Sequence, residues 1–231
     1  MKNRFFILVM AGCFLLNVDS FAQSVRQTIS ILGDSYSTFL GYVTPDTNAC
    51  WYGIPDIEEI NDVRTVEETW WYQLIQEQEG QLEVTNSYSG ATICHTGYNH
   101  EDYSDRSFIT RMDHLGNPGI IFIFGGTNDS WAGVPIGEYQ YANWTTEDLY
   151  KFRPAFCYLL HAMLSRYPDT KIYNITNTEL FQEVSDSMDE ICRYYEIPNI
   201  RLRYIDKQAG HPSVNGMKNI CRQVREALLA E

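Results

Sequence analysis

The chain has 231 residues and a formal net charge of −13, because 17 lysines and arginines face 30 aspartates and glutamates. This length suits one domain with a sizeable hydrophobic core. So acidic a chain repels phosphate backbones, which argues against nucleic acid as a partner, and the sequence shows no histidine and cysteine cluster of the kind that binds zinc.

The first 22 residues are typical of a secretory signal peptide. Two basic residues precede an apolar run over residues 5–16, and small residues precede the expected cleavage position. The apolar run is shorter than the about 20 residues that span a bilayer, so no transmembrane helix is expected. We therefore expect one exported domain over residues 23–231, periplasmic or extracellular. Lipid anchoring through Cys13 is a less favoured alternative.

Beyond this leader, short apolar runs alternate with longer amphipathic ones. The former predict strands, and the latter, with apolar residues every three or four positions, predict helices. Predicted strands cover 28–32, 82–86, 120–124, 171–175 and 200–205, and predicted helices cover 65–79, 106–115, 147–167, 180–195 and 214–229. This alternation predicts a three-layer α/β/α sandwich with a parallel sheet of about five strands and helices on both faces.

The first predicted strand leads through Gly33 and Asp34 into Ser35. A serine at this place lies at the carboxyl edge of the sheet, where open α/β sheets bind ligands. Serine becomes an effective nucleophile when a base lies within hydrogen-bond reach and donors are aimed at the oxyanion that forms. Ser35 is therefore the candidate nucleophile.

The other parts of such a site follow later in the chain. His211 lies in a turn before the last predicted helix and is the best candidate for the base. Gly90 follows the second predicted strand and Asn128 follows the third, so both can present donors at the same edge of the sheet.

These four blocks resemble the SGNH hydrolases, also called the GDSL esterase/lipase family. Gly-Asp-Ser holds Ser35, Ser-Gly holds Gly90, Gly-Thr-Asn-Asp holds Asn128 and His-Pro-Ser holds His211, in the family's order. The resemblance implies a hydrolase in which His211 activates Ser35. It also implies an oxyanion hole made by the Ser35 and Gly90 backbone N–H groups and the Asn128 side-chain amide. It implies no cofactor and no metal ion.

The group that orients His211 departs from the family pattern. The family places an aspartate three residues before the histidine, where this chain has Gln208. Asp206, five residues before His211, is the candidate acid. Gln208 itself, a backbone carbonyl and Glu179 are alternatives, and a Ser-His dyad is a further one.

Loops after the predicted strands carry many aromatic side chains. Trp131 and Trp144 lie in the loop 130–145 and are candidate substrate-binding residues, because planar rings with polar tips suit carbohydrate. Trp51 lies in the long loop 38–64, where it either stacks on a sugar at the mouth of the site or covers the core.

These observations predict an exported serine esterase acting on carboxylic esters. Loop aromatics, acidity and export favour O-acetyl groups on carbohydrate, as in family members that deacetylate polysaccharides. The alternatives are an inactive carbohydrate-binding protein on the same scaffold, for which the missing aspartate argues, and a lipase or acyltransferase. A lipase is less favoured because the sequence shows no long apolar lid.

Overall fold

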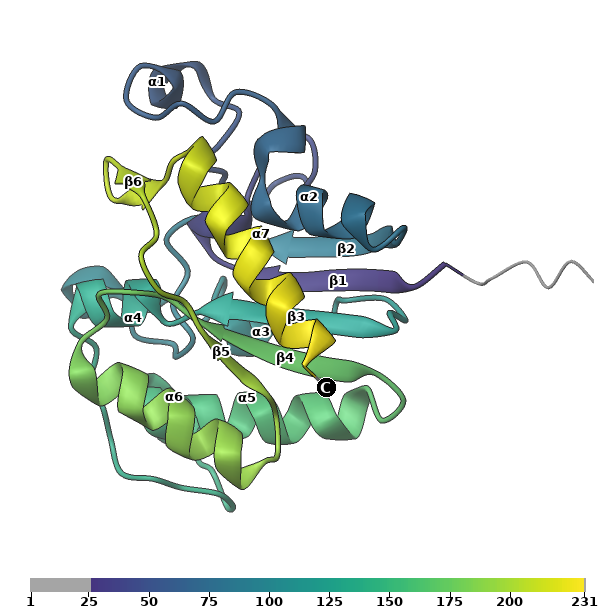
Figure 1. Cartoon of the computed structure of the whole chain (residues 1–231). Helices are drawn as coiled ribbons and strands as arrows, with labels where there is room; N and C mark the ends of the chain where they lie inside the picture. Colours follow the sequence, from purple (N-terminus) through teal and green to yellow (C-terminus); the bar gives the residue numbers. More distant parts are fainter. Residues whose placement is uncertain (1–25, 231) are drawn as a thin grey trace, which may run out of the picture.

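A computed structural model describes residues 26–230 of the chain. It contains a five-stranded sheet with the order β2-β1-β3-β4-β5, in which every neighbouring pair is parallel (Figure 1). The strands are β1 (Thr28–Gly33), β2 (Gln81–Ser87), β3 (Ile120–Gly125), β4 (Lys171–Thr176) and β5 (Asn199–Arg201). The helices are α1 (Pro55–Glu58), α2 (Trp70–Glu77), α3 (Phe108–Arg111), α4 (Thr127–Ala132), α5 (Phe152–Arg166), α6 (Gln182–Tyr194) and α7 (Val214–Leu229).

The central strand β3 shows how the sheet is buried on both faces. Ile121 and Ile123 pack with side chains of α3, α5 and α6, whereas Phe122 and Phe124 pack with side chains of α2 and α7. Successive side chains of a strand point to opposite faces, so a strand covered on both sides is apolar at every position. This explains the continuous apolar run from residue 120 to 124. The predicted three-layer sandwich and its parallel sheet are confirmed.

Several elements differ in length from the prediction. The helix expected over residues 65–79 is a 3-10 turn, Val66–Glu68, followed by α2. A capping box opens this turn, with the Thr65 N–H donating to the Glu68 carboxylate at 3.1 Å. The last strand, expected over 200–205, is only β5, because Tyr204 has a left-handed backbone with φ 55°, which a strand does not allow.

The first three strands of the sheet end level with one another. Gly33 at the end of β1 pairs with Ser87 of β2 and with Phe124 of β3. The loops that follow these strands therefore begin side by side at one edge of the sheet. This register places the residues after Gly33, Ser87 and Gly125 near one another.

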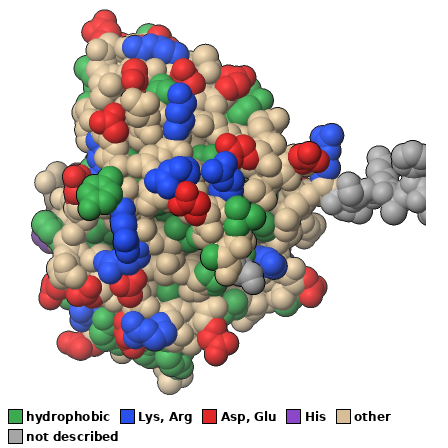
Figure 2. Space-filling view, in the orientation of Figure 1, with side chains coloured by type: hydrophobic (Ala, Val, Ile, Leu, Met, Phe, Trp, Pro, Cys, Tyr) green, Lys and Arg blue, Asp and Glu red, His purple; other side chains and the backbone are tan. Residues whose placement is uncertain are grey.

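The surface of the described residues is mixed in charge. On the face that carries α7 and β5, basic and acidic side chains are interspersed (Figure 2). Two ion pairs on this side join separate elements, Arg225 of α7 with Glu77 of α2 and Arg201 of β5 with Asp189 of α6, both at 2.8 Å. The expected signal peptide lies outside the described residues. No helix within residues 26–230 has the length and apolarity needed to cross a membrane.

Candidate active site

Ser35 begins a 3-10 turn, Ser35–Ser37, directly after β1. Asp34 caps this turn, because its carboxylate accepts a hydrogen bond of 3.0 Å from the Tyr36 N–H. Position 33 has no room for a side chain, because a Cβ there would lie 2.6 Å from the Ser37 side chain. The Ser35 side chain is therefore held at the carboxyl edge of the sheet, and the residue is 2% exposed.

His211 is carried by a small antiparallel hairpin of β6 (Lys207–Gln208) and β7 (His211–Pro212), which the sequence did not predict. Its Nε2 lies 2.9 Å from Ser35 Oγ, across 176 positions of the chain. The hydroxyls of Tyr36 and Tyr52 donate to carbonyls of the hairpin at 2.7 and 2.9 Å. These bonds tie the hairpin to the segment that carries Ser35, so the pair is built into the fold.

The imidazole is oriented by the backbone. His211 Nδ1 lies 3.1 Å from the Ala209 carbonyl oxygen, which can only accept. Nδ1 therefore carries the proton, and Nε2 is left to accept a hydrogen bond from Ser35. The expected role of Asp206 is corrected: its carboxylate accepts a hydrogen bond from the Ser213 hydroxyl, not from His211. Asp206 supports the first turn of α7, since Ser213 is the N-cap of that helix.

The other candidate orienting groups are also engaged elsewhere. The Gln208 side-chain oxygen accepts a hydrogen bond of 2.8 Å from the Asp62 N–H. Glu179 forms an ion pair of 2.9 Å with Lys207. Of the alternatives considered from the sequence, the structure places a backbone carbonyl at Nδ1. Because any residue type supplies a carbonyl, only the lack of an aspartate at position 208 could have signalled this.

Aromatic rings surround the His211 imidazole. Trp51 stacks on it with ring centroids 3.6 Å apart and an angle of 8° between the planes. Trp131 meets it edge-on at 5.8 Å and is 45% exposed. The pKa of His211 is lowered to about 4, chiefly by burial; the Ala209 hydrogen bond opposes this shift, and the nearby Lys207 ammonium adds to it. The imidazole is therefore neutral at pH 7 and able to accept a proton.

The candidate oxyanion donors have N–H groups that are not used elsewhere among the described residues. Within the described part of the chain, neither the Ser35 N–H nor the Gly90 N–H donates a hydrogen bond to another residue. Gly90 has a left-handed backbone with φ 83°, a conformation that other residues adopt at a cost. The Asn128 amide nitrogen donates one hydrogen bond, of 3.0 Å, to the Ala91 carbonyl, and its second N–H has no partner among residues 26–230.

The helix α4 presents Asn128 and is joined to the loop after β2. The sequence predicted a loop at this place, but α4 begins at Thr127, directly after Gly126 with φ 86°. The Asp129 carboxylate accepts hydrogen bonds from the Ile93 N–H at 2.8 Å and the Cys94 N–H at 3.2 Å. Burial raises the pKa of Asp129 to about 6, although these hydrogen bonds oppose the shift.

The two tryptophans expected to bind substrate lie in different surroundings. Trp131 lies beside His211, as described above. The Trp144 ring instead packs on Tyr158 and His161 of α5, and its N–H donates to the Gln140 carbonyl at 2.9 Å. The expectation that Trp144 lines the site is therefore corrected: its apolar ring covers the core at α5.

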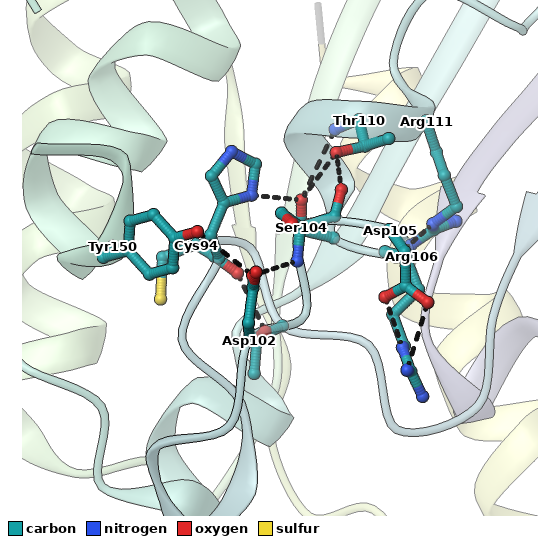
Figure 3. A network of polar contacts seen from close by, with 11 residues as sticks. Cys94, Asp102, Ser104, Asp105, Arg106, Thr110, Arg111 and Tyr150 are labelled. Atoms are coloured by element: carbon teal, nitrogen blue, oxygen red, sulfur yellow. Dashed lines mark hydrogen bonds and ion pairs between the residues drawn. The ribbon is translucent and has the colours of Figure 1, made fainter. Parts of the chain in front are cut away.

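A second serine and histidine pair lies in the loop before α3. His95 Nδ1 is 2.9 Å from Ser107 Oγ. Ser107 is fully buried and is the N-cap of α3, accepting from the Thr110 N–H at 3.4 Å. Figure 3 shows the surrounding network, in which Asp102 accepts hydrogen bonds from the Tyr150 hydroxyl and the Ser104 N–H. Through the N-cap role of Ser107, this pair supports the loop that leads into α3.

The sequence did not predict the contacts that three residues make at the site: Ala209 and Trp51 with His211, and Tyr98 with Asn128. Tyr98 donates its hydroxyl to Asn128 Oδ1 at 2.8 Å. Trp51 was noted as a loop aromatic, but its stacking on His211 depends on how two distant segments fold together.

No group of three or more histidine, cysteine, aspartate or glutamate residues within 26–230 is arranged to hold a metal ion.

Two solved structures from Bacteroides are similar to this chain along most of its length. A crystal structure from Bacteroides uniformis, described as a GDSL-like lipase, is 64% identical, with a TM-score of 0.88 over 89% of this chain and 97% of the other. A second, from Bacteroides ovatus and described in the same way, is 55% identical, with a TM-score of 0.87 over 89% and 99%.

A family two carbohydrate esterase from Clostridium thermocellum shares the fold at 14% identity, with a TM-score of 0.59 over 89% of this chain and 64% of that one. The comparison with curated proteins gave no match. The family model for GDSL-like lipases and acylhydrolases matches residues 27–228, nearly the whole described chain. The chain therefore belongs to the GDSL-like lipase/acylhydrolase family.

Proposed function

We propose that the protein is an exported serine esterase that removes O-acetyl groups from carbohydrate through a covalent intermediate on Ser35. The observation that carries the proposal is the 2.9 Å contact between Ser35 Oγ and His211 Nε2, where the Ser35 N–H has no hydrogen-bond partner among the described residues. A nucleophile, a neutral base and oxyanion donors at one point are the parts that acyl transfer requires.

The chemistry follows from these positions. His211 Nε2 takes the Ser35 proton as Oγ attacks the ester carbonyl carbon, and the oxyanion is held by the Ser35, Gly90 and Asn128 N–H groups. The intermediate collapses, the C–O bond to the alcohol breaks, and His211 returns the proton to the leaving oxygen. Water then attacks the acyl-enzyme by the same route, releasing the carboxylic acid and restoring Ser35.

A Ser-His dyad suffices in this proposal because other groups take over the work of an aspartate. The Ala209 carbonyl fixes the tautomer of His211. The face of Trp51, with its ring centroid 3.6 Å from that of the imidazole, holds the imidazole in its plane. An inactive binding protein would not need a neutral base aligned on a serine.

Carbohydrate is favoured as the alcohol part of the ester by the half-exposed Trp131 ring beside His211, which offers a flat surface for a sugar. The carbohydrate esterase with the same fold is consistent with this choice. Export is favoured by the N-terminal leader of residues 1–22.

The substrate class is tested by following acetate release from acetylated xylan, alongside p-nitrophenyl acetate and p-nitrophenyl palmitate. We expect activity on both acetyl esters and little on the long-chain ester. Preference for the palmitate ester would identify a lipase instead. Binding to xylan with no hydrolysis of any ester above the Ser35→Ala variant would identify a binding protein.

Exchange of Asp206 for asparagine is expected to keep kcat/KM within about threefold of the wild-type value, because this side chain does not reach His211. If Asp206 oriented the base, the loss would approach the roughly 10⁴-fold seen when a triad aspartate is replaced. Steady-state kinetics on p-nitrophenyl acetate measure the difference. A loss above 100-fold, with an unchanged melting temperature, would restore Asp206 as the acid.

The pH profile of kcat/KM is expected to stay flat through neutral pH and to fall only as the pH approaches about 4, the pKa of His211. Activity falls on the acidic side because His211 accepts a proton only when it is neutral, and it is protonated below its pKa. Trp51→Ala admits water to the imidazole and moves this limb toward the ordinary pKa of 6.5, whereas Trp51→Phe keeps a ring face and moves it less. A wild-type limb already at 6.5, or one unmoved in Trp51→Ala, would contradict this.

A further inference from the structure

The Asn128 amide serves the oxyanion hole only in one orientation. An asparagine amide fits its space equally well when it is turned over, which would aim oxygen rather than nitrogen at a developing negative charge. The Ala91 carbonyl accepts from Nδ2 at 3.0 Å, and the Tyr98 hydroxyl donates to Oδ1 at 2.8 Å. Both polar atoms of the amide are thus held, and the remaining Nδ2 N–H has no partner in the part of the chain that the structure describes.

We propose that Tyr98 is a positioning residue that holds the Asn128 amide, through its hydroxyl, in the orientation that donates to the oxyanion. Because the Ala91 carbonyl can only accept, Nδ2 faces it, and Tyr98 must then donate to Oδ1. This hydrogen bond has a second effect: it draws electron density to Oδ1 and makes the free N–H a stronger donor. The inference rests on the proposed function, since it concerns the same oxyanion.

Tyr98 is placed by a tightly folded loop. Its turn, Tyr98–His100, is closed by a hydrogen bond of 2.8 Å from the Gly97 N–H to the Glu101 carbonyl. Asn99 and His100 both have left-handed backbones, with φ 54° and 60°, which non-glycine residues adopt rarely. Unfavourable backbone of this kind persists where the surroundings impose it, and it is frequent at functional sites.

Neighbouring contacts fix the same loop from both sides. A Cβ at Gly97 would lie 2.4 Å from the Tyr103 ring, so the backbone packs directly against that ring. The network of Figure 3 holds the segment after the turn, where Asp102 accepts from the Tyr150 hydroxyl at 3.1 Å. The segment before the turn is held by Asp129, the neighbour of Asn128, through the Ile93 and Cys94 N–H groups.

The loop and α4 therefore form one unit in which Tyr98 and Asn128 keep their relative positions. Burial raises the pKa of Tyr98 to about 12, so the hydroxyl keeps the proton that it donates at any ordinary assay pH. Tyr98 is half-buried and has no contact with Ser35 or His211 among the described hydrogen bonds. Its effect on the reaction passes through Asn128.

The test compares Tyr98→Phe, Asn128→Ala and the double variant on p-nitrophenyl acetate. Tyr98→Phe is expected to lower kcat about tenfold with KM within about twofold, because the oxyanion contact is made in the transition state. The double variant is expected to be no slower than Asn128→Ala, since no amide is left to orient. Tyr167→Phe is the matched control: it removes a tyrosine hydroxyl whose hydrogen bond of 2.8 Å goes to the Met112 carbonyl, outside the Tyr98 loop, and keeps the wild-type kcat.

A second readout does not depend on turnover. The Asn128 side-chain N–H signals, identified by their loss in Asn128→Ala, are expected to shift in Tyr98→Phe and not in Tyr167→Phe. A wild-type kcat in Tyr98→Phe, additive losses in the double variant, or unshifted amide signals would overturn the proposal. If the wild type hydrolyses no ester while the amide signals respond as expected, the orientation by Tyr98 stands and the proposed esterase function falls.

Discussion

Ser35→Ala is expected to lower kcat/KM for ester hydrolysis by roughly 10⁴- to 10⁶-fold, the range for loss of a serine nucleophile. No other hydroxyl contacts His211 Nε2 among the described residues, so no substitute nucleophile is at hand. The fold should be retained, because the lost hydroxyl makes one hydrogen bond, worth about 1 kcal/mol. Kinetics and a thermal melt measure the two effects separately.

Ser37→Ala is the matched control for this variant. Ser37 lies in the same turn and is fully buried, but its Oγ accepts a hydrogen bond of 3.3 Å from the Trp70 indole N–H and does not face His211. We expect Ser37→Ala to keep the wild-type kcat/KM and to lose a similar amount of stability. Equal losses of activity in the two variants would show that the turn, not the Ser35 hydroxyl, is what matters.

Asn128→Ala is expected to lower kcat by roughly 10²- to 10³-fold, the usual effect of removing one oxyanion donor. KM should change little, since the developing charge is present only in the transition state. The variant also loses the hydrogen bonds with Ala91 and Tyr98, so its melting temperature should fall.

Asn174→Ala is the control that separates the loss of kcat from the loss of stability. Asn174 is a fully buried asparagine of β4 whose amide donates to Asn199 Oδ1 at 2.7 Å, within the sheet. Its loss should lower the melting temperature and leave kcat per folded molecule unchanged. A fall in kcat as large as that of Asn128→Ala would mean that destabilisation alone accounts for the result.

Much of this architecture was predictable because the strands of a parallel sheet deliver their following loops to one edge. The apolar run 120–124 marked the central strand, and Ser35, Gly90 and Asn128 each follow a strand. The register of β1, β2 and β3 starts the three loops at one edge of the sheet, and His211 contacts Ser35 there. Because β1 pairs with both β2 and β3, the loops that carry Ser35, Gly90 and Asn128 are neighbours at that edge.

The parts that were not predicted depend on backbone conformation and on contacts between distant segments. Ala209 contacts His211 through its backbone carbonyl, and Ala209 has a left-handed φ of 47°. An alanine side chain gives no sign in the sequence of such a backbone conformation. Tyr98 reaches Asn128 only because its loop turns through two further left-handed residues. Trp131 and Trp144 looked alike in sequence, but α4 fixes the first beside His211 and the core at α5 takes up the second.

The central claim is that Ser35 is an activated nucleophile, and its direct test is covalent capture. Diethyl p-nitrophenyl phosphate transfers its phosphoryl group to an activated serine and releases p-nitrophenolate. Peptide mass spectrometry is predicted to find one adduct, on Ser35 within the tryptic peptide 27–64, in the wild type and in Ser37→Ala. No adduct should form in Ser35→Ala. An unmodified wild-type protein, or an adduct that persists in Ser35→Ala, would contradict the account.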